Sequence, residues 1–111
     1  MSFDKRIDER VPILGELHGE IMVFQPMMLK EISRGGLTVE SRTPLHLNSS
    51  HDLRLTLAET SVVVKARVVH SRISDVHQDV VTYRTGLEFL DVSERTDAAI
   101  ADFLDKLKTG A

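Results

Sequence analysis

Apolar and polar residues alternate through the middle of the chain, and this period of two constrains the fold more than any other feature of the sequence. Successive side chains of a β-strand point to opposite faces, so the alternation predicts strands that bury one face and expose the other. The two clearest runs lie at residues 53–57 and 62–68. The second run is rich in valine, which favours a strand over a helix. The apolar positions are Leu53, Leu55 and Leu57 in the first run and Val62, Val64, Ala66 and Val68 in the second.

The rest of the chain before residue 91 also divides into short strand-like segments separated by turn residues. The first apolar region begins at Val11, and Pro12 favours a strand start or an edge position. Gln25 and Pro26 predict a break after that region, and the polar residues 74–79 predict the loop of a hairpin. The predicted strands are 19–24, 27–33, 36–41, 52–57, 61–73 and 80–90.

Residues 91–111 change period and predict a helix. Ile100, Phe103, Leu104 and Leu107 follow the i, i+3, i+4, i+7 spacing of an amphipathic helix. A helix of this length is not stable alone, so we expect it to pack on the strands. The residues suited to its ends are Ser93 or Thr96 as the N-cap, Lys106 and Lys108 beside the C-terminal dipole, and Gly110 as the stop.

These segments predict an all-β fold, a six-stranded antiparallel β-barrel with a C-terminal α-helix. The length of 111 residues suits one domain, and an apolar fraction of 41% is enough for one compact core. Residues 1–10 are polar and lack apolar periodicity. We therefore expect residues 1–10 to form a flexible N-terminal arm and residues 11–111 to form a single barrel domain with its helix.

The composition excludes several classes of function. The absence of cysteine excludes disulfides, thiolate metal sites and cysteine catalysis. No apolar run is long enough to cross a bilayer, and no apolar signal core follows the N-terminus, so we expect a cytoplasmic protein without membrane insertion. The net charge of −3 does not suit a general nucleic-acid binder, which normally carries a positive face. Any anionic ligand must be held by a local arginine site.

Metal-binding and catalytic patterns are also missing. The five histidines show none of the spacings typical of metal ligands. His70 has the parity of the inward-facing valines, which predicts a place at the end of the barrel. Ser33 has no evident activating partner. We therefore expect a protein that is not an enzyme and needs neither a metal nor a cofactor.

The stretch from Glu31 to Gly36 joins two predicted strands and has the sequence Glu-Ile-Ser-Arg-Gly-Gly. A glycine pair between apolar runs predicts a tight turn, and glycine allows a close approach of the backbone to a ligand. If the incoming strand continues through Ser33, the side chains of Glu31 and Ser33 project from the same face. For this stretch alone, a polar β-turn whose serine bonds its own backbone is the simpler interpretation.

Two arginines near the N-terminus extend this pattern. Arg6 and Arg10 stand in the order Arg-x-x-x-Arg, and Glu31, Ser33 and Gly36 follow as Glu-x-Ser-x-x-Gly. Together the two motifs resemble the signature of the PilZ domain family, in which Arg-x-x-x-Arg precedes Asp- or Asn-x-Ser-x-x-Gly. Residues 84–89 are similar to the closing strand of the same family, with its recurring glycine and phenylalanine. Glu31 departs from the pattern, because the family usually has Asp or Asn there.

The resemblance implies a small β-barrel that binds the bacterial second messenger cyclic di-GMP. The implied ligand-binding residues are Arg6, Arg10, Glu31, Ser33 and Gly36. Arginine matches both the O6 and N7 acceptors of guanine and the oxygens of phosphate. The carboxylate of Glu31 could accept hydrogen bonds from guanine N1–H and N2–H, Ser33 could bond phosphate or base, and Gly36 would keep the barrel wall bare.

Three hypotheses about function follow. The leading one is a cyclic di-GMP receptor that couples the second messenger to an unidentified effector protein. The alternative, which Glu31 motivates, is a degenerate PilZ domain that does not bind nucleotide and acts as a protein-interaction adaptor. An enzyme or a nucleic-acid-binding barrel is the third, and the acidic balance and the missing catalytic groups disfavour it.

Overall fold

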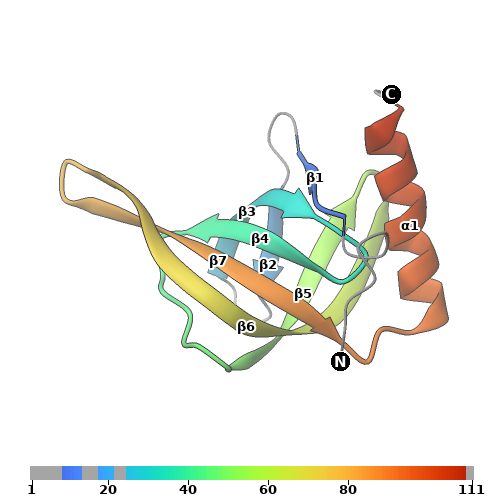
Figure 1. Ribbon diagram of the computed structural model, residues 1–111, viewed down its shortest axis with the longest axis horizontal. Coiled ribbons are helices and arrows are strands. Elements are labelled where there is room, and N and C mark those ends of the chain that lie inside the picture. Colours follow the sequence, from blue (N-terminus) through green and yellow to red (C-terminus); the bar gives the residue numbers. More distant parts are fainter. Residues whose placement is uncertain (1–8, 14–17, 22–24, 110–111) are drawn as a thin grey trace.

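The computed structural model describes residues 9–13, 18–21 and 25–109, and in these ranges it contains seven strands and one helix (Figure 1). All neighbouring strands are antiparallel. The elements are β1 (Val11–Pro12), β2 (His18–Ile21), β3 (Gln25–Ile32), β4 (Gly36–Ser41), β5 (Ser50–Leu57), β6 (Thr60–His77), β7 (Val80–Leu90) and α1 (Glu94–Lys108).

The strands form one sheet in the order β1-β3-β2-β5-β6-β7-β4, and β4 pairs again with β3. The pairing of six strands therefore returns to β3, and the two-residue strand β1 adds to β3 beside this ring. The predicted fold class, an antiparallel PilZ-like barrel with a C-terminal helix, is confirmed. The ring has the predicted six strands, and β1 is an additional one, because the first apolar region contributes two strands, β1 and β2.

The predicted break at Gln25 and Pro26 is wrong, because both residues belong to β3. Pro26 pairs with Glu20 of β2. A proline near the start of a strand is tolerated because its fixed φ fits extended backbone and only one amide donor is lost. Residues 22–24, the last part of the strand predicted at 19–24, lie outside the described residues.

The hairpin between β6 and β7 is longer than predicted, since residues 74–77 belong to β6 and not to a loop. Its turn consists of Gln78 and Asp79, with φ of 48° and 68°. A two-residue turn with both residues at positive φ matches the twist of the flanking strands, so pairing continues up to the turn in spite of the polar sequence. The hairpin projects beyond the rest of the molecule as a two-stranded ribbon (Figure 1).

The core lies inside the curved sheet, and α1 covers one end of it (Figure 1). The predicted parity of the two alternating runs is confirmed, because Leu53, Leu55, Val64 and Val68 are all buried. Helix α1 contacts β1, β5 and β6. Its buried residues are Ile100, Phe103 and Leu104.

The ends of α1 identify its caps. Ser93 is the N-cap, and its Oγ accepts a hydrogen bond of 3.2 Å from the amide of Thr96, which satisfies one of the free amides of the first turn. Thr109 is the C-cap, and Gly110, the predicted stop, lies outside the described residues.

Candidate functional site

An open pocket of about 380 Å³ lies on the outer face of the sheet, opposite the core. The sheet register explains why its residues meet. Glu31 of β3 pairs with Thr38 of β4, Thr38 pairs with Gly86 of β7, and Gly86 pairs with His70 of β6. Four strands therefore contribute to one row across the sheet. The pocket is lined by Arg10, Glu31, Thr38, His70, Arg72 and Arg84.

Arg10 immediately precedes β1 and is held at this pocket by its own side chain and by the pairing of residues 11–13 with β3. Its Nη1 donates a hydrogen bond of 3.1 Å to Oγ1 of the buried Thr38. The amide of Ile13 donates to the carbonyl of Lys30 at 3.0 Å, which fixes the segment along β3. Of the two predicted arginines, Arg10 therefore lies beside Glu31. Arg6 lies outside the described residues, as does most of the predicted arm.

Glu31 is half-buried and reaches the outer face through a β-bulge. Leu29 pairs with Val39, but the next pair is Glu31 with Thr38, so Lys30 is an extra residue. The bulge changes the parity of the strand and turns the carboxylate away from the core. Glu31 and Arg10 therefore line the same pocket without forming an ion pair with each other.

Ser33 is placed differently from Glu31. It follows β3, is fully buried, and does not line the pocket. Its Oγ accepts hydrogen bonds from the amides of Gly35 at 3.2 Å and Gly36 at 3.1 Å, and its own amide donates to the carbonyl of Gly36 at 2.8 Å. The serine therefore builds the turn, as in the simpler sequence interpretation. The expected common face for Glu31 and Ser33 is wrong, because the strand ends at Ile32.

Gly36 is required by strand packing. A Cβ at this position would lie 2.1 Å from the carbonyl oxygen of Leu87 in β7. Backbone atoms cannot give way as a flexible side chain can, so any larger residue would push β4 from β7. Strand packing alone therefore explains why residue 36 is a glycine, and no ligand is needed for that explanation. A role for Gly36 in binding stays a prediction.

His70 lies at the pocket and is exposed, contrary to the prediction that it faces inward at the end of the barrel. Val68 pairs with Leu87 and His70 pairs with Gly86, so Val69 is an extra residue in a second β-bulge. A Cβ at Gly86 would lie 2.1 Å from Nε2 of His70, so the imidazole occupies the space that a side chain at 86 would fill.

The same bulge places one arginine that sequence reasoning missed, Arg72, and the facing strand β7 supplies a second, Arg84. Arg72 has the parity of the inward valines in sequence, and only the extra residue at 69 moves it to the outer face. There it pairs with Arg84 of β7, and both line the pocket. The sequence identified Arg84 only as the first residue of the segment that resembles the closing strand of PilZ domains, and not as a residue of the site.

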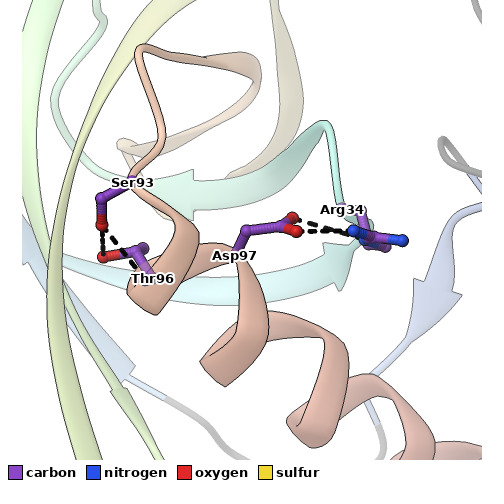
Figure 2. Close-up of polar contacts among 4 residues, drawn as sticks. All are labelled: Arg34, Ser93, Thr96 and Asp97. Atoms are coloured by element: carbon purple, nitrogen blue, oxygen red, sulfur yellow. Dashed lines mark hydrogen bonds and ion pairs between the residues drawn. The ribbon is translucent and has the colours of Figure 1, made fainter.

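The turn after β3 also contacts α1 (Figure 2). Nη2 and Nε of Arg34 donate to the two carboxylate oxygens of Asp97, at 2.5 Å and 3.4 Å. These hydrogen bonds, together with the negative charge of Asp97, raise the pKa of the Arg34 guanidinium above its ordinary value. At the other end of the helix, Nζ of Lys108 lies 2.6 Å from Oε2 of Glu9. Helix α1 thus contacts both segments that carry the predicted motif.

Residues 9–13, 18–21 and 25–109 contain neither a metal site nor a membrane-spanning helix. No group of three or more His, Asp or Glu side chains is arranged to hold a metal ion there. In the same ranges no helix is long and apolar enough to span a membrane.

Comparison with solved structures shows the same fold in several proteins. The chain superimposes on the PilZ domain with c-di-GMP of YcgR from Escherichia coli with a TM-score of 0.77 and 13% identity, covering 96% of this chain and 94% of that one. MrkH of K. pneumonia gives a TM-score of 0.77 at 18% identity, with 99% of this chain and 51% of MrkH covered. The inhibitor of motility MotI/DgrA from Bacillus subtilis gives a TM-score of 0.73 at 18% identity, with 97% of this chain and 53% of MotI covered.

The chain spans about half the length of MrkH and MotI, and 47% of the YcgR chain in its complex with c-di-GMP. No curated protein sequence matches the chain significantly. The family model of the PilZ domain matches residues 3–106, which is nearly the whole chain and includes both motifs and all seven strands. The chain therefore belongs to the PilZ domain family.

Proposed function

We propose that the protein is a receptor for cyclic di-GMP that couples this second messenger to an effector protein, and that it catalyses no reaction. The observation that carries the proposal is that Arg10 and Glu31 line the same pocket. A guanidinium can bond guanine O6 and N7 or a phosphate, and a carboxylate can accept from guanine N1–H and N2–H. The two groups together match the polar edges of one guanine nucleotide.

The remaining predicted residues have supporting roles in this proposal. Arg6 stands four residues before Arg10 and would bring a second guanidinium to the same ligand. Ser33 and Gly36 act indirectly, since they hold the turn that follows Glu31 and let β4 pack against β7. Their hydrogen bonds and close packing fix the backbone on which Glu31 is presented.

Relatives of the same fold support the choice of ligand. Structures of the YcgR PilZ domain and of MrkH contain c-di-GMP, and MrkH is described as a c-di-GMP-dependent transcription regulatory factor. Shared family and fold make the same ligand the first to test here. The proposed receptor is bacterial and cytoplasmic and acts without a membrane, and the negative net charge supports a protein partner over nucleic acid.

The competing function is an adaptor that has lost nucleotide binding. The observation that favours it is Glu31, which is one methylene longer than the usual aspartate of the family. The adaptor hypothesis predicts no nucleotide binding by the parent protein and a gain of binding in Glu31→Asp. Titration of the two proteins with cyclic di-GMP separates the hypotheses.

Isothermal titration calorimetry with cyclic di-GMP, GTP and cyclic AMP tests the proposal. We expect cyclic di-GMP to bind, and GTP and cyclic AMP to bind far more weakly. Arg10→Ala should weaken binding by about 1–3 kcal/mol, the free energy of one good bidentate contact. Arg42→Ala is the matched control, because Arg42 is exposed and does not line the pocket. Equal affinity for the three nucleotides, or equal losses in the two variants, would contradict the proposal.

A further inference from the structure

We propose that Arg72 and Arg84 form a second anion-binding pair in the pocket, suited to phosphate groups, which receives a phosphodiester group of the bound dinucleotide. The dinucleotide part of this inference rests on the proposed function. The anion-binding part rests on the geometry of β6 and β7 alone. Neither arginine belongs to the two sequence motifs.

The register of the sheet places the two arginines directly opposite each other. Arg72 of β6 pairs with Arg84 of β7, and both line the pocket together with Arg10. Directly opposed residues have Cβ atoms about 4.5–5.5 Å apart, and like charges at this distance destabilise a strand pair. An anion between the two guanidinium groups would turn this repulsion into attraction.

The protein itself supplies little to neutralise the pair. Among the described residues, neither Arg72 nor Arg84 forms an ion pair, whereas Nη2 of Arg67, on the same strand as Arg72, lies 3.1 Å from Oε2 of Glu88. The acid opposite Arg84 in β4 is Glu40, and its carboxylate lies 3.8 Å from Nζ of Lys30. The cationic pair is therefore open to an external partner.

Arg84 also carries an unsatisfied donor. Its Nε is buried and has no hydrogen-bond partner. Every other buried side-chain nitrogen or oxygen in the described part of the chain has one. Buried donors in native proteins are nearly always paired, so the Arg84 side chain gains a hydrogen bond if it turns its Nε toward an acceptor in the pocket. The oxygens of a phosphate ester are acceptors that match the fork of an arginine.

The charge of the pocket favours a phosphate over the edge of a base. Three arginines and one glutamate line it, in a chain whose net charge is −3. A guanine edge is neutral and would leave the repulsion between Arg72 and Arg84 in place. A phosphodiester carries one negative charge and can accept hydrogen bonds from both arginines at once.

The first test is calorimetric titration of Arg72→Gln and Arg84→Gln with cyclic di-GMP. Each variant should bind about tenfold more weakly, because it loses one charge-assisted contact. Arg67→Gln is the matched control, since Arg67 is on β6 but is paired with Glu88 outside the pocket, and it should stay within about twofold of the parent. Affinities within twofold of the parent in both test variants would overturn the proposal.

The second test does not depend on the dinucleotide. Inorganic pyrophosphate, compared with sodium chloride at equal ionic strength, should raise the unfolding temperature of the parent more than that of the double variant Arg72→Gln/Arg84→Gln. Equal increases would overturn the anion pair even if cyclic di-GMP binds. A parent that binds no cyclic di-GMP but shows the larger increase with pyrophosphate would refute the proposed function and support the anion pair.

Discussion

At the scale of single residues, two glycines with too little space for a Cβ are expected to respond differently to substitution. The clash at Gly36 is with the backbone of Leu87, and the clash at Gly86 is with the exposed side chain of His70. Gly36→Ala should therefore destabilise the fold by about 1–3 kcal/mol, as overpacking does. Gly86→Ala should cost at most about 0.5 kcal/mol, because the imidazole can rotate away.

Thermal unfolding of the two variants measures this difference. His70→Ala/Gly86→Ala is the control, since it removes the ring that the new methyl group would meet. A Gly36→Ala variant as stable as the parent would show that β4 and β7 can separate at little cost, and the structural explanation of this glycine would be wrong.

Glu31 is the residue at which the family resemblance is weakest. Glu31→Asp should change the affinity for cyclic di-GMP by no more than about tenfold, because a shorter arm loses reach but also loses less side-chain entropy on ordering. Glu31→Ala should weaken binding more, since guanine donors lose their acceptor. Glu31→Lys should weaken it most, because it brings a positive charge to those donors. Titration of the series checks the order, and a parent weaker than Glu31→Ala would contradict it.

At the scale of elements, the period of the sequence predicted which segments are strands and which is the helix, but not how each strand is rotated. The alternation of Leu53 and Leu55 is regular because β5 pairs without interruption. In β6 the extra residue Val69 reverses the parity, so the positions of His70 and Arg72 could not be predicted from alternation. A bulge depends on the partner strand and leaves no period in the sequence.

The candidate site was predictable in part for the same reason. Arg10 and Glu31 come from motifs, and a motif identifies residues without knowledge of the register. Ser33 was predicted as a ligand-binding residue at the end of a strand, with a turn serine as the simpler alternative. Its burial could not be predicted, because it depends on the strand ending one residue earlier than expected. Arg84 could not be assigned to the pocket without the register of β4 against β7.

Helix α1 is expected to report the state of the site through Arg34 and Asp97 (Figure 2). Addition of cyclic di-GMP should shift the amide resonances of the first turn of α1, and Asp97→Asn should reduce these shifts because the turn is no longer tied to the helix. Global stability should change little, since the ion pair is exposed. NMR titration checks this prediction.

The matched control for this titration is Asp102→Asn on the same helix. Asp102 pairs with Lys106 at 3.2 Å within α1 and does not contact the turn. Shifts of equal size in the parent and in Asp97→Asn would show that the ion pair transmits nothing. High salt should act on the parent as Asp97→Asn does, because it screens an exposed pair.

At the scale of the whole molecule, the pocket that Arg10, Arg72 and Arg84 line lies where the N-terminal segment meets the sheet. Residues 1–8 lie outside the described part of the chain, and their flexibility stays a prediction from composition. Hydrogen exchange should show a protected amide at Ile13, which donates to Lys30, in the free protein. Amides from Arg6 to Arg10 should exchange fast without ligand and slow down with cyclic di-GMP. Strong protection of those amides in the free protein would refute the predicted arm.

The bulge at Val69 has a consequence in genetic terms. An in-frame deletion of the Val69 codon would remove the extra residue, so β6 would alternate regularly and would still place His70 opposite Gly86 and Arg72 opposite Arg84. A change that kept this codon but straightened the bulge would instead turn Arg72 toward the protein interior and bring Ile73 to the outer face. The pocket can therefore tolerate the loss of this codon, which encodes none of its residues, but not the loss of the bulge while the codon remains.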